Sequence, residues 1–516
     1  MLIYSPRTCR VVSISGQGPA PARATIACFR EAGISLIPGN GLLAATVPAA
    51  FDAWVTALSR FGTMSLCDVM EPALELAADG FSVYPGLRRA IERQQNTFRN
   101  DWPSTAAIYL PDGAVPAVGD RLRQPDWAAA MSRTVEVEAL AIRAGADREA
   151  ALQAARDVFY RGPIARAIVE FAAHTQVVDH SGKAHAGLLS LDDLDSYRSR
   201  LDEPVHADYH GYDVFKCGSW TQGPVFLQQL RLLEGYDLHA LGHNTPAYIH
   251  VLVEAAKLAF ADRDAYYADP LFADVPLPRL LSREYAAQRR ALIDLERASL
   301  TPRPRDLGQE LAGPPADGGV HRHDTTHLDA IDADGLMISV TPSGAWISSS
   351  PVVEGLGFPL GTRAQMFSLD PAHPNCLAPG KRPRTTLTPS LVMRGGKPHM
   401  VFGTPGGDQQ DQWTLQFFLN VIEFGMDLQE AADAASFHTD HLASSFYPRE
   451  TLLGRLSLEG RIPQATRSVL EALGHRIEVV NDWANGQVCG ARIDPNSGLL
   501  EACASPRGQS AYAMGY

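Results

Sequence analysis

The stretch HRHDTTHLDAIDADGLMISVTPS, residues 321–343, places two neighbouring threonines directly before a segment in which polar and apolar residues alternate. Alternation on both sides of the DADG sequence predicts a β-hairpin closed by a two-residue loop. The two possible centres of that loop place Thr325 opposite either Pro342 or Gly344. In both registers Ser343 lies within one residue of the position that faces Thr325, and cross-strand neighbours are ~5 Å apart. We therefore expect two hydroxyl groups to meet at the open end of this hairpin.

Thr325 has two interpretations. Threonine is a common strand residue, so the pattern is also typical of a strand that simply begins here. The chemical interpretation starts from cleavage of the bond between Asp324 and Thr325, which leaves Thr325 with a free α-amine of pKa ~7.7–8.0. Such an amine is a base near neutral pH and activates the neighbouring hydroxyl as a nucleophile. The same hydroxyl can attack the preceding carbonyl, so one side chain would serve both self-cleavage and catalysis.

A second hairpin is predicted in TLTPSLVMRGGKPHMVFGTPGG, residues 386–407, with RGGK at its turn. It runs through GTPGGD, residues 403–408, into a helix predicted to begin at Asp408. Gly406 and Gly407 allow backbone N–H groups to converge at a helix N-terminus, where they can stabilise an oxyanion. A glycine-rich turn without chemistry has the same pattern, so this motif gains weight only beside a nucleophile.

The order of the predicted elements indicates an α+β fold with layered helices and strands. Helical periodicity dominates residues 48–169, and residues 245–267 predict a helix that is apolar on most faces and therefore buried. Strands cluster later, apart from a hairpin predicted in VHADYHGYDVFKC, residues 205–217. Proline, glycine and charged residues crowd together in residues 301–324, which are predicted to form an exposed loop at the main boundary of the chain.

Size and composition exclude several classes of protein. The 516 residues exceed one ordinary core and carry a net charge of −13 without clustered Lys or Arg, which excludes nucleic acid as a partner. No apolar run approaches the ~20 residues of a membrane helix, and the first residues lack the zones of a signal peptide. The seven cysteines form no CxxC pair. A reducing, cytoplasmic location without membrane contact is therefore expected.

Several motifs together resemble the γ-glutamyltransferase (glutathione hydrolase) family of N-terminal-nucleophile hydrolases. They are TTH at Thr325, KRPRTTLTPS, FGTPGGD and AADAASFH, while LSLDDLDSY, GYDVFKC and EAAKLAFADRDAYYADP resemble the family's large subunit. The resemblance implies a four-layer αββα sandwich and self-cleavage between Asp324 and Thr325. It makes residues 1–324 the large (α) subunit, short at its N-terminus, and residues 325–516 the small (β) subunit. No cofactor or metal is implied.

The resemblance also assigns roles to individual residues. Thr325 falls on the nucleophile, and Ser343 falls on a second hydroxyl that supports it. Gly406 and Gly407 fall on the oxyanion-hole glycines. The residues that fall on positions binding the substrate's α-carboxylate or amino group are Thr385, Thr386 and Gln365.

Other substrate contacts of the family are changed in this sequence. The arginine that grips the carboxylate falls at Gln17, the asparagine after the second hydroxyl at Ala345, and the aspartate that binds the amino group at Ser368. Each lost charge-assisted contact removes about 1.5–3 kcal/mol, so glutathione is expected to be a poor substrate. The residues left as alternative contacts are Asp370 for the amino group and Arg384 or Arg363 for a smaller carboxylate.

The resulting prediction is an amidohydrolase or acyltransferase that forms an acyl-enzyme through Thr325 on a small-molecule amide, with γ-glutamyl donors such as glutathione. The sequence also resembles the branch that includes oxamate amidohydrolase, and this gives an alternative substrate, a small amide that carries a carboxylate. An unprocessed family member that acts only as a binding protein is a further alternative. A metal hydrolase is disfavoured because no HExxH motif accompanies the candidate ligands, His321, His323, His327, His438 and His441.

Overall fold

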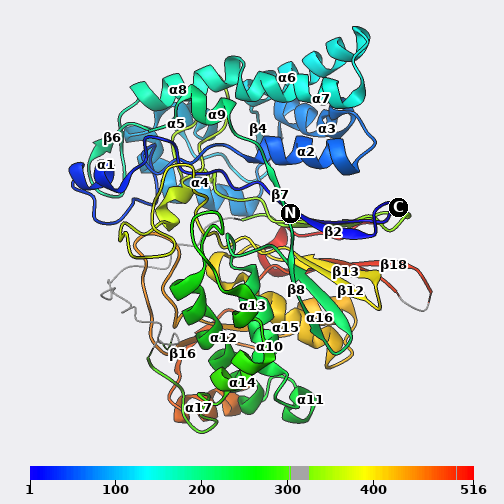
Figure 1. Cartoon of the computed structure of the whole chain (residues 1–516). Helices are drawn as coiled ribbons and strands as arrows, with labels where there is room; N and C mark the ends of the chain where they lie inside the picture. Colours follow the sequence, from blue (N-terminus) through cyan, green and yellow to red (C-terminus); the bar gives the residue numbers. More distant parts are fainter. Residues whose placement is uncertain (302, 304–324, 495–496, 516) are drawn as a thin grey trace.

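The computed structural model describes residues 1–301, 303, 325–494 and 497–515. Two β-sheets lie face to face at its centre, with one layer of helices above them and another below (Figure 1). This is the α+β four-layer sandwich expected from the sequence. The parts of the chain before and after Thr325 both contribute strands to each sheet, so the two predicted subunits share one core.

The first sheet has five antiparallel strands in the order β10-β11-β1-β2-β7. Its central strand comes from the N-terminus of the chain, and the hairpin that carries Thr325 forms one edge. The strands are β1 Leu2–Ser5, β2 Arg10–Ser15, β7 Arg200–Asp202, β10 Leu328–Ile331 and β11 Met337–Val340.

The second sheet contains the two other hairpins predicted from the sequence. Its order is β18-β17-β13-β12-β9-β8, and all neighbouring strands are antiparallel. Positive φ angles at His210, Gly211, Gly395 and Gly396 form the two-residue loops of these hairpins, as type I′ turns require. The strands are β8 Val205–Tyr209, β9 Tyr212–Lys216, β12 Ser390–Arg394, β13 Lys397–Gly403, β17 Cys489–Ile493 and β18 Leu500–Ala504.

Apolar side chains from both sheets fill the space between them. Leu2 and Met337 of the first sheet belong to one buried cluster with Leu391 and Val401 of the second. Side chains alternate between the two faces of a strand, so this cluster uses one face of each sheet. The packing places β11 against β12 and β13, and it thereby brings the two predicted motifs together.

Helices cover the outer face of each sheet (Figure 1). No helix within the described ranges is long and apolar enough to span a bilayer. On the side of the five-stranded sheet, where α2 contacts β2, the helices are α1 Ile26–Glu31, α2 Ala50–Phe61, α3 Leu66–Asp79, α4 Pro85–Asn100, α5 Pro103–Tyr109, α6 Pro125–Arg143, α7 Arg148–Tyr160, α8 Pro163–His174 and α9 Leu191–Asp195.

The helices on the side of the six-stranded sheet form the largest apolar core. Most of them follow the elements of that sheet in the chain. They are α10 Gly223–Leu233, α11 Leu238–Leu241, α12 Pro246–Tyr266, α13 Leu277–Leu280, α14 Arg283–Arg290, α15 Gln410–Ile422, α16 Leu428–Asp433 and α17 Gln464–Ala472.

Short elements complete the molecule. A three-stranded sheet in the order β14-β15-β16 lies beyond α15, and two small ribbons pair β3 with β4 and β5 with β6. These strands and the 3₁₀ turns are β3 Phe81–Ser82, β4 Arg121–Leu122, β5 Val177–Val178, β6 Ala184–His185, β14 Phe437–Thr439, β15 Arg455–Glu459, β16 Arg476–Val480, η1 Pro111–Gly113, η2 Arg363–Met366, η3 Gly407–Gln409 and η4 Arg507–Gln509.

Helix α12 is the buried helix predicted from residues 245–267. The Thr245 side chain caps it by accepting a hydrogen bond from the Tyr248 amide at 3.3 Å, and Pro246 occupies the first turn, where no amide donor is needed. Every residue from Tyr248 to Arg263 is buried, which explains why apolar residues occupy most faces of this helix.

The loop of the β10–β11 hairpin differs from the two-residue loop predicted from DADG. The pairing runs from Leu328 opposite Val340 to Ile331 opposite Met337, which leaves three residues between the closing pair, Asp332 and Leu336. The Asp332 carboxylate accepts hydrogen bonds from the amides of residues 334 and 336, at 3.0 and 2.8 Å. This aspartate and a left-handed glycine in the loop stabilise the longer turn, so the two-residue prediction was wrong.

A smaller correction concerns the helix after the second hairpin. It was predicted to begin at Asp408, but a 3₁₀ turn, η3, spans Gly407–Gln409 first and α15 begins at Gln410. The tight turn continues directly into the helix, so the helical N-terminus still lies at the glycine pair.

Candidate active site

Two hydroxyl groups meet at the open end of the β10–β11 hairpin. Thr325 Oγ1 and Ser343 Oγ are hydrogen-bonded at 3.0 Å, and the Thr326 amide donates to the Pro342 carbonyl at 3.2 Å. In the observed register, Thr325 and Ser343 face each other directly rather than one residue apart. Thr325 is 9% exposed, so its hydroxyl lies in a largely desolvated position.

A buried histidine holds the strand that follows Thr325. The His327 ring bonds to the Thr341 hydroxyl at 2.8 Å through Nδ1 and to the Asp329 carboxylate at 2.9 Å through Nε2. A Cβ on Gly403 of β13 would lie 2.1 Å from this ring, so only glycine lets the sheets approach here. Sequence reasoning considered His327 only as a metal ligand; its place two residues after Thr325 was the signal for this positioning contact.

The two glycines predicted for an oxyanion hole adopt backbone conformations that favour glycine. Gly406 has φ +134° and Gly407 has φ +62°. A Cβ on Gly406 would lie 2.2 Å from the Trp413 ring, and one on Gly407 would lie 2.9 Å from the Phe446 ring. Both the backbone angles and the surrounding rings therefore exclude other residues at this turn.

One cavity of about 440 Å³ connects these motifs. Its lining includes Thr325 from the first hairpin and Gly406 and Gly407 from the second, so the tertiary structure brings the nucleophile candidate and the glycine pair to one space. Other lining residues come from the later part of the chain, among them Trp413, His438, Asp440, Phe446 and Tyr447. The Thr325 side chain therefore borders the space in which a small molecule could bind.

A network of charged residues supports the glycine turn. The carboxylate of Asp408 pairs with Arg263 and accepts hydrogen bonds from the Ser445 amide at 2.8 Å and the Ser445 hydroxyl at 2.6 Å. Burial opposes ionisation, but the positive charges of Arg263 and Arg384 hold the pKa of Asp408 below its ordinary value. The ionised carboxylate fixes the segment that begins α15.

None of the residues predicted to contact substrate lines the main cavity. Gln365 uses its amide group within the protein: Nε2 donates to the Gly39 carbonyl at 3.1 Å, and Oε1 accepts from the Tyr447 amide at 3.0 Å. Gln365 therefore holds Tyr447, a residue of the cavity wall. The Ser368 hydroxyl accepts a hydrogen bond from the Asp370 amide at 3.1 Å.

Thr385 and Thr386 lie on the buried segment that leads into β12. The Thr385 amide donates to the Trp220 carbonyl at 2.9 Å. The Thr386 hydroxyl is buried and has no hydrogen-bond partner among the described residues. Gln17, where the family arginine was expected, bonds to the neighbouring Gly18 carbonyl at 2.8 Å and lines a second, small cavity of about 60 Å³ together with Ser343.

Two buried arginines were predicted as alternative carboxylate contacts. Arg384 donates to the Ser445 hydroxyl at 2.7 Å and lies 3.5 Å from the Asp264 carboxylate, so it belongs to the network around Asp408. Within the described residues, the one hydrogen bond of the Arg363 side chain runs from its guanidinium group to the Met366 sulfur, at 3.5 Å. Burial lowers the pKa of both guanidinium groups to about 9.

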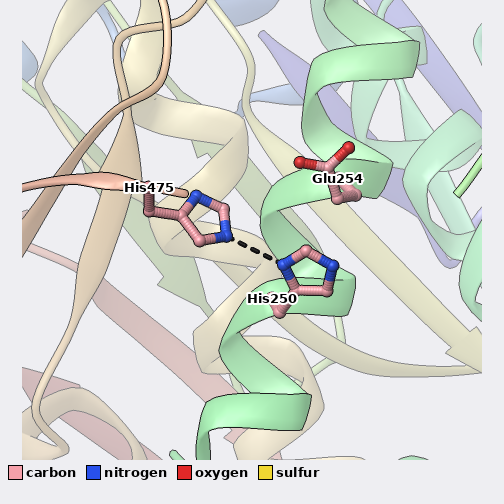
Figure 2. A group of neighbouring side chains, drawn as sticks. All are labelled: His250, Glu254 and His475. Carbon is pink, nitrogen blue, oxygen red and sulfur yellow. Dashed lines mark hydrogen bonds between the residues drawn. The ribbon is translucent and has the colours of Figure 1, made fainter. Parts of the chain in front are cut away.

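Potential metal ligands gather at His250, Glu254 and His475 (Figure 2), none of which lines the main cavity, and at His327, Asp329 and Cys489. His250 Nδ1 and His475 Nε2 lie 2.8 Å apart and share a hydrogen bond. The Glu254 carboxylate already binds Lys257 at 2.7 Å and Arg303 at 3.0 Å. Because two cations already bind the Glu254 carboxylate, a metal ion would add a third positive charge there. This cluster is therefore better explained as a buried network of ion pairs and histidines.

The histidines considered as metal ligands from the sequence do not converge in the described structure. His327 has both ring nitrogens occupied, His438 lines the cavity beside Trp413, and His441 accepts a hydrogen bond from the Gly454 amide at 2.9 Å. His321, His323 and the cleavage-site residue Asp324 lie outside the described residues.

The whole chain matches one known family. A family model described as gamma-glutamyltranspeptidase covers residues 1–515. The chain belongs to the gamma-glutamyltranspeptidase family. It is thus an enzyme of the amide hydrolase and acyltransferase type, and the N-terminal-nucleophile hydrolase sandwich expected from the motifs is confirmed.

Individual relatives share both sequence and structure with this chain. The glutathione hydrolase-like YwrD proenzyme of Bacillus subtilis (strain 168) is 32% identical, over 99% of this chain and 88% of the relative. The structure titled LmbA2991HD is 43% identical with a TM-score of 0.93, covering 100% of this chain and 89% of that one. The structure of cephalosporin acylase from Bacillus halodurans is 28% identical with a TM-score of 0.81, and the match covers 98% of this chain and 84% of that one.

Proposed function

We propose that this gamma-glutamyltranspeptidase-family protein is a self-cleaved amidohydrolase or acyltransferase whose nucleophile is Thr325. The observation that carries the proposal is the 3.0 Å contact between the hydroxyls of Thr325 and Ser343, beside a cavity that Gly406 and Gly407 also line. Residues 1–324 form the large subunit and residues 325–516 the small subunit after cleavage.

Self-cleavage begins when Thr325 Oγ1 attacks the carbonyl carbon of Asp324. The C–N bond breaks and an ester to Oγ1 replaces it, which leaves the Thr325 nitrogen as an amine. Water then hydrolyses the ester and releases a carboxylate at Asp324. Ser343 donates or accepts a hydrogen bond at the attacking oxygen, and this contact fixes the oxygen's position for both reactions.

Turnover of a substrate uses the amine that cleavage creates. The α-amine of Thr325 takes the hydroxyl proton while Oγ1 attacks the substrate's amide carbonyl, and it passes the proton to the leaving nitrogen. Backbone amides at Gly406 and Gly407 stabilise the oxyanion of the tetrahedral intermediate. Water releases the acyl group as a carboxylate; an amine acceptor releases it as a new amide.

The acyl donor is either a γ-glutamyl amide, such as glutathione, or a smaller amide that carries a carboxylate, such as oxamate. Gln17, Ala345 and Ser368 replace the charged and polar contacts that a glutamyl donor needs, and this favours the smaller donor. A protein that stays uncut and only binds its ligand is the non-catalytic alternative.

Denaturing electrophoresis followed by N-terminal sequencing tests the proposal. We expect two fragments, and the shorter one begins Thr-Thr-His. Ammonia or amine release is then measured for glutathione, a γ-glutamyl anilide, glutaramate and oxamate. A persistent full-length chain without turnover of any of these amides would favour the binding protein, and a shorter fragment with a different first residue would remove Thr325 as the nucleophile.

A further inference from the structure

Arg363 stands out among the buried charges of this molecule. It is the first residue of η2, and its side chain is only 2% exposed. Among the described residues its Nε and Nη2 atoms have no hydrogen-bond partner and it forms no ion pair, although the negative charge of Asp408 partly offsets the effect of burial on its pKa. The guanidinium carbon lies 5.0 Å from the centre of the Trp346 ring and 5.8 Å from that of Phe446.

Several other buried arginines have a carboxylate partner. Arg156 pairs with Asp52, Arg263 with Asp264 and Asp408, Arg382 with Asp269, and Arg507 with Glu459. Burying a cation without such a partner carries a large desolvation penalty, which aromatic faces offset only in part. A buried polar group left unpaired in this way is typical of a site that a ligand completes.

The position of Arg363 connects this unpaired charge with the nucleophile. A Cβ on Gly344, the residue after Ser343, would lie 3.1 Å from Arg363 Nε. On its other side Arg363 faces Phe446, which lines the main cavity and lies against Gly407. The guanidinium group therefore lies between Gly344, which follows Ser343, and the ring of Phe446, which packs against Gly407.

The neighbouring sequence explains why the side chain fits there. The family's asparagine after the second hydroxyl falls at Ala345, which has a much smaller side chain, and Gly344 before it has none. The Thr362 amide donates to the Gly344 carbonyl at 3.2 Å, which fixes the start of η2 against this strand end. An arginine on η2 therefore occupies space beside two residues with small or absent side chains.

We propose that Arg363 binds a carboxylate on the acyl part of the donor, and that the donors are short monoamides of dicarboxylic acids, in the size range from oxamate to glutaramate. This inference rests on the proposed function, because it requires the amide carbonyl to lie at Thr325. Arg363 does not line the cavity, whereas Phe446 does and its ring centre lies 5.8 Å from the guanidinium carbon, so the proposal requires the Phe446 ring to move when the carboxylate binds. The enzyme then selects its donors by the negative charge of their carboxylate, and a donor needs no α-amino group.

Matched pairs of substrates test the proposal on the processed enzyme. Initial rates of ammonia release per amide group are measured for oxamate against oxamide and for succinamate against succinamide, in which a neutral amide replaces the remote carboxylate. We expect the wild type to prefer each acid, and Arg363→Met to reduce that preference about 10- to 100-fold in kcat/KM, the range of one charge-assisted contact. Arg363→Lys keeps the charge and is expected to retain part of the preference.

Arg384→Met is the matched control, because Arg384 is also buried but bonds to Ser445 and lies near Asp264. We expect it to lower turnover of acids and diamides together. A loss of acid preference in this variant and not in Arg363→Met would overturn the inference. The inference would also be overturned if the wild type used acids and diamides equally well. If Thr325→Ala were inactive in that case, the proposed function would still stand.

Thermal unfolding separates binding from a structural role. If Arg363 serves a ligand, Arg363→Met removes an uncompensated buried charge, so its melting temperature stays equal to or exceeds that of the wild type. Failure of both Arg363 variants to fold or to cleave themselves would show that Arg363 stabilises the core, and the inference would be wrong.

Discussion

Two buried polar clusters of this protein differ in how their charges are balanced. In the cluster of His250, Glu254 and His475 (Figure 2), Lys257 and Arg303 bind the carboxylate, and neither cavity described above includes these residues. Around Thr325 the main cavity meets two glycines with positive φ angles.

Arg363, beside the Thr325 cluster, has no acid partner in the described structure. The carboxylate of the first cluster is balanced by cations of the protein, whereas the arginine beside the second lacks an ion-pair partner that a substrate can supply. Unbalanced charge and glycine-only backbone beside a cavity therefore distinguish the candidate active site, whereas the number of titratable groups does not.

The largest effect is expected at the nucleophile. Thr325→Ala removes the attacking oxygen, so self-cleavage and turnover should both fall by at least ~10⁴-fold. Electrophoresis and ammonia release measure the two losses. Thr326→Ala is the control, because this neighbouring side chain is exposed and should leave both reactions close to wild type. Cleavage and turnover at the wild-type level in Thr325→Ala would refute the assignment.

A second effect is expected at the glycine turn. Gly407→Ala strains a backbone with φ +62° and brings a Cβ to 2.9 Å from Phe446, so kcat should fall about 10²- to 10³-fold, as for a lost oxyanion contact. Gly425→Ala is a close control, because Gly425 has φ +65° and no atom within 4 Å of an added Cβ. Equal losses in the two variants would mean that backbone strain alone, and not the site, explains the effect.

The supporting hydroxyl should matter less than the glycines. Ser343→Ala removes the partner 3.0 Å from Thr325 Oγ1, and a single hydrogen bond predicts about a tenfold fall in the rates of cleavage and turnover. Ser343→Thr keeps a hydroxyl at this position and should retain most of the rate. Time courses of precursor cleavage provide the measurement. An unchanged rate in Ser343→Ala would show that the Ser343 hydroxyl does not support the reaction.

The histidine cluster should affect stability and not catalysis. Burial lowers the pKa of His475 to about 3, whereas an unfolded histidine has a pKa of ~6.5. Below pH ~6.5 the unfolded state binds more protons at this site, so its contribution to stability is complete above that pH and declines as the pH falls towards 3.

Urea unfolding between pH 7.5 and 5 measures this contribution. We expect His475→Gln to reduce the slope of unfolding free energy against pH by up to about 1.4 kcal/mol per pH unit in the acidic range. Turnover at pH 7.5 should remain within a few-fold of wild type. An unchanged slope would show that His475 is protonated in the folded protein, and a large loss of turnover would connect this cluster with catalysis.

Local sequence was sufficient for the hairpins and for the pairing of the two hydroxyls. Thr325 and Ser343 are separated by a single hairpin, so strand alternation limits their register to within one residue. The remaining error arose from the Asp332 side chain, which stabilises a three-residue loop. The helix around Tyr248 to Arg263 was equally predictable, because one long apolar segment determines it.

Contacts between distant segments were not predictable in the same way. Nothing near Gln365 in the sequence indicates that its amide bonds to Gly39 and Tyr447, or that Arg363 lies between Trp346 and Phe446. The division at Asp324 and Thr325 stays a prediction, because residues 304–324 lie outside the described structure.

Local patterns in the chain were enough to predict the elements, the glycine turn and the hydroxyl pair, because each depends on side chains and φ angles within a few tens of residues. Which of these groups share a cavity, and which buried charges lack an ion-pair partner among the described residues, became known from the packed structure. That outcome depends on how two sheets pack through an apolar interface, and such packing joins residues that no spacing in the chain relates.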